Sequence, residues 1–248
     1  HEKAGIIKPS VPVVVGEALP LTRPVFEAKA QKEGATIVFA EDIPAVLSSH
    51  DTPDGREYRT RYLGTLRGEL RGDYQTRNAN TIVTAAMLLI NRGIIRHPES
   101  VGEGLATVCR RTGLTGRWQS LPGHPHAVCD TGHNVAGWQY LSRQIEAQPA
   151  RTRRIVFGMV DDKDLTHVMA LLPQDATYYW TQPSTHRAFP VEKVAACGQN
   201  CGLCGSIFHT VPEAYQAALA DADPDDFLFV GGSSYVVADL LASLQATK

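Results

Sequence analysis

The loop after one predicted strand carries two side chains that could do chemistry. The segment "AVCD" predicts a strand ending at Asp130, and His133 follows in the loop before a helix begins. In open α/β sheets, ligands bind beyond the carboxyl ends of the strands, close to helix N-termini. Asp130 and His133 are therefore candidates for a binding or catalytic site. Helix capping by Asp130 and Asn134 would explain the same pattern.

Two further residues combine recognition chemistry with a suitable place in the chain. Asn78 lies at the entry to a strongly predicted helix, and its amide offers a donor and an acceptor that suit the edge of an adenine ring. The same position suits an N-cap. Arg117 lies in a segment rich in glycine and proline, where a permanently charged guanidinium could bind a phosphate. A surface ion pair is the alternative for Arg117.

Lys3, next to Glu2, is a candidate of a different kind. An ordinary lysine is an ammonium group, which has no lone pair for a metal ion. Neutral lysine can take up carbon dioxide to form a carbamate, whose two oxygens could bind Mg²⁺. The spacing of these residues does not by itself establish the modification.

The segment "CGQNCGLC" has the spacing of a metal site. Cys197, Cys201 and Cys204 form a C-x3-C-x2-C pattern, which radical enzymes use for an iron–sulfur cluster, and His209 could complete a zinc set. The motif lies late in the chain, at the end of a predicted helix and among glycines. These features favour three free thiols in a turn, and a metal-binding protein remains the alternative.

The elements that must position these residues follow two patterns. Residues 11–40 predict strand–helix–strand, residues 56–74 predict the strands of a hairpin, and residues 78–93 and 98–113 predict two helices. The segment 111–126 is rich in Gly and Pro and predicts a domain boundary. Beyond it, strands alternate with helices of about 10 residues, which is typical of a parallel, doubly wound sheet.

Composition excludes several classes of protein. Hydrophobic residues make up 43% of the 248 residues and charged residues 20%, which are ordinary values for globular domains. The formal net charge of −2 gives no reason to expect nucleic acid or an anionic membrane as a partner. No apolar run approaches the roughly 20 residues of a membrane-spanning helix. The odd number of five cysteines favours a reducing cytoplasm.

Taken in order, the motifs resemble those of folylpolyglutamate synthase and dihydrofolate synthase, within the Mur ligase superfamily. Two of the family's usual prolines are replaced, by Thr115 and Val135. The resemblance covers almost the whole chain, and its segments are "EKAGIIKPSVPVV", "LRGDYQTRNANT", "TGRWQSL", "DTGHNVAG", "VFGMVDDKD" and "VGGSSYVVADLL".

This resemblance implies both a fold and an activity. Residues 1–116 would be the remainder of a Mur-type central ATPase domain, and residues 117–248 a Rossmann-like C-terminal domain with a mostly parallel sheet. The enzyme would use ATP and Mg²⁺ to phosphorylate a carboxylate of dihydropteroate or a reduced folate such as tetrahydrofolate. The α-amine of L-glutamate would then attack the acyl phosphate. A monomer is expected.

The resemblance also implies roles for the candidate residues. Carbamylated Lys3 would bind the second Mg²⁺, and Asn78 would hold the adenine. Arg117 would bind the phosphates, and Asp130 would contact the nucleotide from the C-terminal domain. His133 would lie near the reacting carboxylate or the glutamate.

The family's glycine-rich phosphate loop is expected upstream of Lys3, and the chain contains no Gly-Lys dipeptide. We therefore expect the C-terminal part of a longer enzyme, inactive alone. The alternatives are another Mur-type amino-acid ligase, a non-catalytic nucleotide-binding domain, and a metal-binding protein that uses the "CGQNCGLC" segment.

Overall fold

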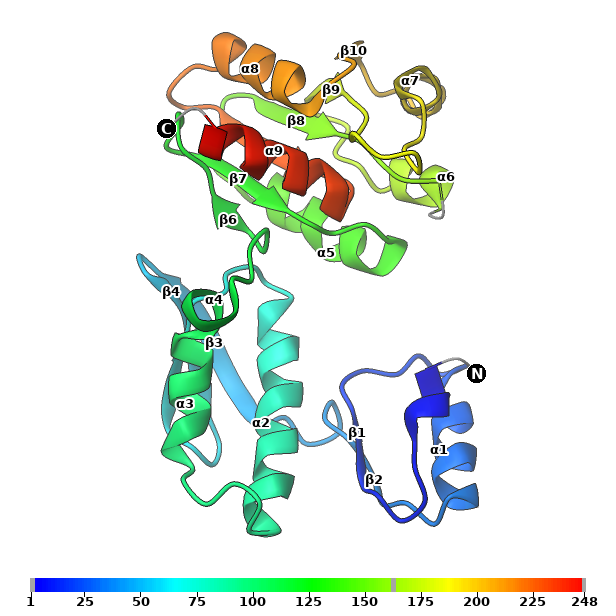
Figure 1. The fold of residues 1–248 in the computed structure, drawn as a ribbon, viewed down its shortest axis with the longest axis vertical. Coiled ribbons are helices and arrows are strands. Elements are labelled where there is room, and N and C mark those ends of the chain that lie inside the picture. The colour runs from blue at the N-terminus through cyan, green and yellow to red at the C-terminus, as the bar shows by residue number, and fades with distance from the viewer. Residues whose placement is uncertain (1–2, 162–163, 247–248) are drawn as a thin grey trace. The chain divides into compact units, whose positions relative to one another are not determined.

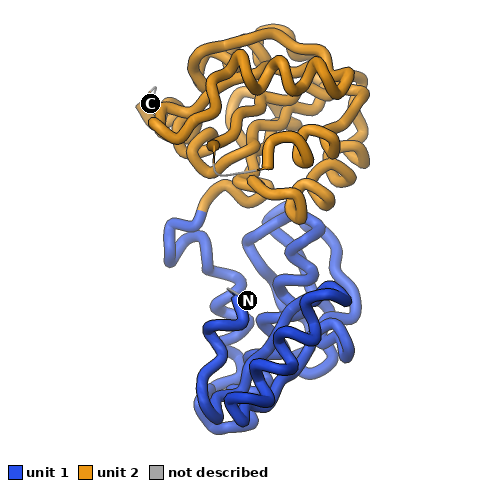
Figure 2. Tube along the Cα trace, turned by 90° about the vertical axis from the view of Figure 1, so that its right-hand side faces the viewer, with its two compact units in different colours: residues 1–114 blue, residues 115–248 orange. Residues whose placement is uncertain are grey.

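The chain folds into two compact units. A computed structural model describes residues 3–161 and 164–246, and the division falls between Leu114 and Thr115 (Figure 2). The boundary expected from the sequence lies two residues further along the chain. Among the described residues, no helix is both long and apolar enough to span a membrane.

Unit 1 begins with the strand–helix–strand arrangement that the sequence predicts. A short 3-10 helix, η1 (Lys3–Ile6), precedes β1 (Val13–Val15), α1 (Arg23–Lys32) and β2 (Ile37–Phe39). The two strands pair in parallel, with Val13 opposite Ile37 (Figure 1). Pro24 lies in the first turn of α1, where its missing N–H costs no hydrogen bond. This prediction is confirmed.

The second part of unit 1 is a three-stranded antiparallel sheet with helices packed on it. The strands are β3 (Val46–Thr52), β4 (Gly55–Thr60) and β5 (Thr65–Gly68), and the longest helix is α2 (Gln75–Asn91). Tyr58, Ala79 and Val83 belong to the core cluster between this sheet and α2. The hairpin expected from residue 56 onward is present, but the sequence interpretation missed β3.

The single helix expected over residues 98–113 is wrong. The structure has two helices, α3 (Glu99–Ala106) and α4 (Val108–Thr112), because Thr107 has a non-helical φ of −135°. Glu69 favours this break, since one of its carboxylate oxygens accepts a 2.6 Å hydrogen bond from the backbone N–H of Cys109 in the first turn of α4.

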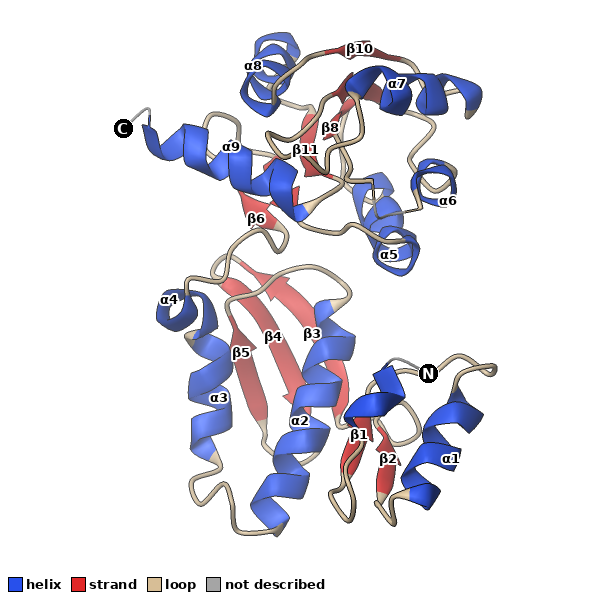
Figure 3. Ribbon diagram, turned by 45° about the vertical axis from the view of Figure 1, so that its right-hand side comes forward, coloured by secondary structure: helices blue, strands red, loops and turns tan. Residues whose placement is uncertain are grey.

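Unit 2 is built around a six-stranded sheet with the order β10-β9-β8-β11-β7-β6. Figure 3 shows strands of this unit in red among helices in blue. Only β6 runs antiparallel to its neighbour, so the predicted, mostly parallel sheet is confirmed. The strands are β6 (Gln119–Ser120), β7 (Ala127–Asp130), β8 (Arg153–Phe157), β9 (Thr177–Trp180), β10 (Gly205–Ile207) and β11 (Phe227–Gly231).

Helices cover both faces of this sheet, and the alternation of side chains along β11 shows how. Leu228 and Val230 pack in a cluster with Val236 and Leu240, on the face of α8 (Val211–Asp221) and α9 (Ser234–Ala246). Phe229 lies on the other face, where its ring contacts Trp138 of α5 (Val135–Glu146). The remaining helices are α6 (Leu165–Met169) and α7 (Val191–Asn200).

Candidate functional site

Asp130 ends β7 as predicted, and its carboxylate binds the backbone of two loops. One oxygen, Oδ2, accepts a 2.8 Å hydrogen bond from the N–H of Trp118, and Oδ1 accepts one of 2.8 Å from the N–H of Gly132. The residue is only 2% exposed. Capping of α5 belongs to Asn134, whose side chain accepts from the N–H of Gly137 at 2.8 Å. The capping interpretation is therefore confirmed for Asn134 and wrong for Asp130.

The segment from Gly116 to Trp118 forms a strained turn, which we call the Arg117 turn. Gly116 has a φ of +70°, and Trp118 has a φ of +45°, which is rare for a side chain of that size. The carbonyl of Gly116 accepts from the N–H of Thr131 at 2.9 Å, and its own N–H donates to Oε1 of Gln119 at 2.7 Å. A Cβ on Gly116 would lie 2.7 Å from a methyl carbon of Thr131, so this position requires glycine.

Arg117 is held by this turn with its side chain only partly buried. Among the residues that the structure describes, none forms an ion pair or a hydrogen bond with Arg117. The alternative of a surface ion pair is therefore not supported. The segment expected to be an irregular linker is instead ordered against the carboxyl end of β7.

His133 lies in the loop after Asp130, as expected, and is partly exposed. Its Nδ1 is 3.0 Å from the carbonyl oxygen of Thr131. Because a carbonyl oxygen can only accept, Nδ1 donates, which leaves Nε2 of the neutral ring as an acceptor. The loop thus presents an imidazole that could take up a proton, in the same loop region as the Arg117 turn.

The turn after β11 also lies at the carboxyl ends of the strands, where its backbone packs closely against the loop after β8. A Cβ on Gly232, whose φ is +101°, would lie 2.4 Å from the carbonyl oxygen of Gly158 in the loop after β8. Ser233 is 1% exposed, and its Oγ accepts from the N–H of Val236 at 3.1 Å in the first turn of α9. The glycine and serine residues therefore pack two loops together and cap a helix.

Asn78 of unit 1 does not cap α2, because the helix begins three residues earlier, at Gln75. Its side chain is exposed, and its Nδ2 donates a 3.0 Å hydrogen bond to Oε1 of the buried Gln75. The capping interpretation is wrong, and an exposed amide on the first turns of a helix is compatible with ligand recognition. The nearby Asn80 has a structural role, since its Oδ1 accepts from the N–H groups of Ala45 and Val46.

Sequence reasoning missed a buried arginine that ties α2 to the sheet. Arg56 on β4 is 7% exposed, and its guanidinium contacts Asp51 at 2.7 Å and Asp73 at 3.3 Å. Its Nε also donates to Ser49, whose Oγ lies 2.7 Å from the hydroxyl of Thr76 in the first turn of α2. The sequence feature that could have revealed this role is the position of Arg56 on a predicted strand whose side chains are partly buried.

The His, Cys, Asp and Glu side chains that the structure describes do not gather into a metal site. Lys3 is exposed in η1, and Glu2 lies outside the described residues. Throughout residues 3–161 and 164–246, no three His, Cys, Asp or Glu side chains converge as metal ligands. Cys197, Cys201 and Cys204 are free thiols in this structure, so the described residues give no support to an iron–sulfur or zinc site. Burial, followed by the neighbouring Cys201, raises the pKa of Cys197.

The five predicted site residues divide between the units. Lys3 and Asn78 lie in unit 1, whereas Arg117, Asp130 and His133 lie together around the carboxyl end of β7 in unit 2. Of the motif "VFGMVDDKD", Asp162 and Lys163 lie outside the described residues.

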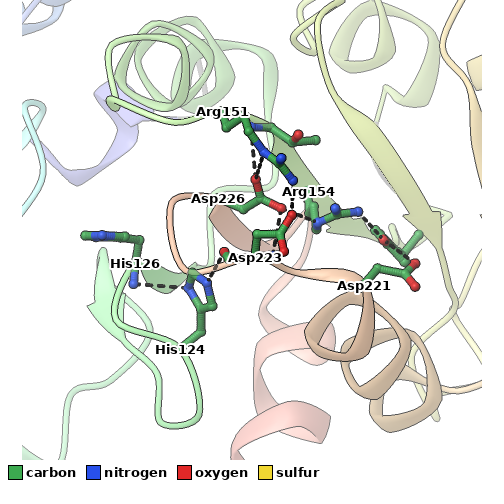
Figure 4. Close-up of polar contacts among 9 residues, drawn as sticks. His124, His126, Arg151, Arg154, Asp221, Asp223 and Asp226 are labelled. Carbon is green, nitrogen blue, oxygen red and sulfur yellow. Dashed lines mark hydrogen bonds and ion pairs between the residues drawn. The ribbon is translucent and has the colours of Figure 1, made fainter.

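A second polar cluster, absent from the sequence interpretation, lies at the amino ends of β8 and β11 (Figure 4). Asp226 is fully buried, and its Oδ2 accepts from Nε of Arg154 at 2.9 Å. Oδ1 of Asp226 accepts from the N–H of Thr152 at 3.1 Å, and Arg151 lies 3.9 Å from the same oxygen. Arg154 also donates to the hydroxyl of Tyr179 at 3.0 Å. These contacts satisfy the buried charges and indicate a structural role.

The comparisons with known proteins agree with this geometry. Residues 116–234 match the family described as Mur ligase, glutamate ligase domain. The chain is 27% identical to the dihydrofolate synthase/folylpolyglutamate synthase of Escherichia coli (strain K12), covering 100% of this chain and 55% of that protein. It is also 27% identical to the folylpolyglutamate synthase of Lacticaseibacillus casei, covering 99% and 57%.

A solved structure gives the same result. The structure described as E. coli FolC in complex with DHPP and ADP matches with a TM-score of 0.76 and 27% identity, over 99% of this chain and 56% of that chain. The chain thus spans about half the length of the curated relatives it matches. Residues 116–234 thus resemble a glutamate ligase domain, and the chain is similar along its whole length to folylpolyglutamate and dihydrofolate synthases.

Proposed function

We propose that this chain is part of an ATP-dependent ligase that joins L-glutamate to dihydropteroate, to a reduced folate such as tetrahydrofolate, or to both. The observation that carries the proposal is the Arg117 turn, whose backbone is bonded to Thr131 and Asp130 at the carboxyl end of β7, next to the loop of His133. The relatives supply the substrate class, since one is named as a dihydrofolate synthase/folylpolyglutamate synthase and the other as a folylpolyglutamate synthase.

The reaction has two steps. The γ-phosphoryl group of ATP passes to a carboxylate oxygen of the pterin substrate, which gives an acyl phosphate and ADP. The amine of L-glutamate then attacks the acyl carbon, the C–O bond to phosphate breaks, and the amine loses a proton. The products are an amide and inorganic phosphate. Positioned cations that stabilise charge on the transferred phosphoryl group contribute most to catalysis of this kind.

In this proposal, unit 2 supplies the groups around the phosphates and the nucleophile. Arg117 binds the phosphates, because it remains charged at any working pH and its fork of N–H groups matches phosphate oxygens. Asp130 belongs to the same site. His133 lies near the glutamate, where the acceptor Nε2 could receive the proton that the amine loses.

Unit 1 supplies the adenine side. Asn78 is exposed on α2 and offers its amide to the base. Residues 1–116 are assigned to the central ATP-binding domain and residues 117–248 to the C-terminal domain. Mg²⁺ is proposed to arrive with the phosphates of ATP, as is usual for this ion. Lys3, as its carbamate, is the one residue here proposed to bind it. The described residues form no metal site of their own, so we assign no step to the metal.

The 248 residues contain no Gly-Lys dipeptide and therefore no loop of the G-x-x-G-K-[ST] type. We accordingly propose that this chain alone does not turn over ATP, and that activity requires a phosphate loop supplied from outside these residues.

The test is ADP release by the protein produced from its complete reading frame, with ATP, Mg²⁺ and L-glutamate. One reaction contains dihydropteroate and the other tetrahydrofolate, which shows which glutamate is added. We expect turnover with at least one substrate, and a loss of about 100-fold or more in kcat/KM for Arg117→Ala. Absence of turnover with both, in a folded protein, would point to another Mur-type ligase.

A further inference from the structure

We propose that Gln75 is a positioning residue that decides which base the nucleotide site accepts, because it orients the side-chain amide of Asn78. This role rests on the proposed function, in which Asn78 holds the adenine. It deepens that function by assigning the choice between adenine and guanine to a second side chain, which is buried and does not contact the nucleotide.

Two side chains in the first turns of α2 share a hydrogen bond. Nδ2 of Asn78 donates to Oε1 of Gln75 at 3.0 Å, and residues three apart lie on the same face of a helix. Asn78 is exposed, whereas Gln75 is only 5% exposed. The bond therefore joins an amide that a ligand can reach to an amide that a ligand cannot reach.

This bond selects one of two orientations of the Asn78 amide. The last torsion of an asparagine side chain has a broad, roughly two-fold preference, so the residue alone does not decide where its oxygen and its nitrogen point. Gln75 accepts one of the two hydrogens on Nδ2 and leaves the other. Among the residues that the structure describes, none donates to Oδ1 of Asn78. A ligand thus meets one acceptor and one donor in a fixed order.

A fixed acceptor beside a fixed donor distinguishes the two purine bases. Along the edge that includes N7, adenine presents its 6-amino donor next to the N7 acceptor, whereas guanine presents two acceptors, O6 and N7. Oδ1 and Nδ2 of Asn78 together match the adenine edge. With guanine, Oδ1 would face O6 unless the amide rotated and lost its bond to Gln75. Guanine is therefore disfavoured by about the free energy of that hydrogen bond.

The surroundings of Gln75 are mostly apolar, which makes an amide unusual at this position. Gln75 lines a cavity of about 30 Å³ together with Leu70, Ala79 and Leu105. Burial of an amide among such groups costs free energy unless the amide is hydrogen-bonded, and Asn78 supplies a bond to its oxygen. An apolar side chain of the same size would serve for packing. The contact with Asn78 gives a reason for an amide here.

The first turns of α2 also lie where a nucleotide can bind. The guanidinium of Arg77 pairs with Glu17, which follows the carboxyl end of β1. A Cβ on Gly16 would lie 2.5 Å from Oγ1 of Thr81, so the chain at this strand end packs directly against α2. Asn78 is flanked along the helix by these two contacts. Ligands of α/β proteins bind beyond the carboxyl ends of parallel strands.

The test compares ATP with GTP in the protein produced from its complete reading frame. Release of inorganic phosphate is the readout, because it does not depend on the base. We expect the wild type to prefer ATP. Gln75→Met removes the acceptor at nearly constant size, and it should lower the ratio of kcat/KM for ATP to that for GTP about fivefold, the scale of one hydrogen bond. Most of this change should be a lower KM for GTP, since the released amide can rotate toward O6.

Gln75→Glu is the conservative variant, because it retains an acceptor oxygen for Nδ2 and should keep the wild-type ratio. Thr84→Val is the matched control. It removes another side-chain hydrogen bond of α2, 2.8 Å long, to the carbonyl oxygen of Asn80, so the ratio should not change.

Two results with the variants would overturn the role of Gln75. One is an unchanged ratio in Gln75→Met, and the other is a KM that rises equally for both nucleotides, as general damage to α2 would cause. Equal use of ATP and GTP by the wild type would overturn it as well. Absence of turnover in the wild type would instead overturn the proposed function, and the role of Gln75 with it.

A measurement on the wild type keeps the test decisive if Gln75→Met does not fold. The analogue 7-deaza-ATP retains the 6-amino group but has carbon in place of N7, so Nδ2 of Asn78 loses its acceptor. We expect a KM severalfold above that of ATP. Equal KM values would show that the oriented amide does not bind this edge of the base, and the inference would fail.

Discussion

Two buried aspartates lie at opposite ends of the sheet of unit 2, and their partners differ. Asp226, at the amino end of β11, is paired with the guanidinium of Arg154 at 2.9 Å. Asp130, at the carboxyl end of β7, binds the backbone N–H groups of Trp118 and Gly132. One carboxylate joins strands by charge, whereas the other holds a strained turn.

The difference shows how one side-chain type serves two purposes. The ion pair at the amino ends of the strands joins β8 to β11, and the buried Asp226 carboxylate is neutralised by Arg154. At the other end, the carboxylate binds backbone N–H groups, and within residues 3–161 and 164–246 no partner pairs with the guanidinium of Arg117. Among the described residues of unit 2, Trp118 at the Asp130 end is the non-glycine residue with a positive φ, and strain of this kind is often found at functional sites.

The largest expected loss of stability comes from removing the carboxylate of Asp226. Asp226→Ala should lower the free energy of unfolding of unit 2 by about 3–5 kcal/mol, because it leaves the guanidinium of Arg154 buried without its partner. Urea denaturation followed by tryptophan fluorescence would measure this loss, since the three tryptophans, Trp118, Trp138 and Trp180, all lie in unit 2.

Asp225→Ala is the control for that experiment, because Asp225 is adjacent in sequence but exposed. Its unfolding free energy should stay within about 0.5 kcal/mol of the wild type. If the two variants were equally stable, the ion pair at this end of the sheet would not be the stabilising contact described here.

A smaller loss of stability is expected from adding a methyl group at Gly116, near the carboxyl end of β7. Gly116→Ala should cost about 1–3 kcal/mol beyond the backbone penalty for a positive φ, since its Cβ would lie 2.7 Å and 2.8 Å from methyl carbons of Thr131 and Val237. Gly123→Ala provides the comparison in the same unit. Gly123 also has a positive φ, of +94°, but its Cβ would meet Leu219 at an ordinary 3.5 Å. Similar urea midpoints for the two variants would contradict the steric clash expected at Gly116.

The smallest effect concerns the thiol next to Asp130. Burial, and then the Asp130 carboxylate, raises the pKa of Cys129 from its ordinary value to about 12. The folded state therefore holds this proton more tightly than the unfolded state. Its stabilising contribution is complete below about pH 9 and is lost as the pH rises toward 12.

We therefore expect the wild type to lose about 1 kcal/mol more than Cys129→Ala between pH 8 and pH 10, in urea denaturation. Below pH 9 the two proteins should differ by a constant amount. Parallel curves up to pH 10 would show that the thiol titrates normally in the folded protein.

Much of the fold could be predicted because hydrophobic patterns act locally. The strands at Asp130 and Gly231 and the helix beginning after Asn134 are each specified by a few adjacent residues. β3 was missed because its exposed pattern, in "VLSSHDT", carries little apolar signal until β4 pairs with it. The break at Thr107 was missed for a similar reason, since Glu69 lies 40 residues from the N–H of Cys109 that it binds.

The site was predictable in its residue types but not in its contacts. Asp130 and His133 were placed correctly at a strand end, because the carboxyl ends of parallel strands collect functional loops. The bond from Asp130 to Trp118 depends on a strained φ, which no periodicity reveals. The Arg154–Asp226 pair joins residues 72 positions apart, and it could be inferred only once β8 and β11 were known to be neighbours.

The two-residue strand β6 has a consequence for behaviour in solution. It pairs antiparallel with β7, with Gln119 opposite Cys129, and so covers one edge of the sheet with chain that also forms the Arg117 turn. The opposite edge is β10, three exposed residues that include Gly205. Short edge strands resist pairing with other molecules. The segment that forms the Arg117 turn therefore also gives this edge of the sheet a short strand, which disfavours edge-to-edge pairing.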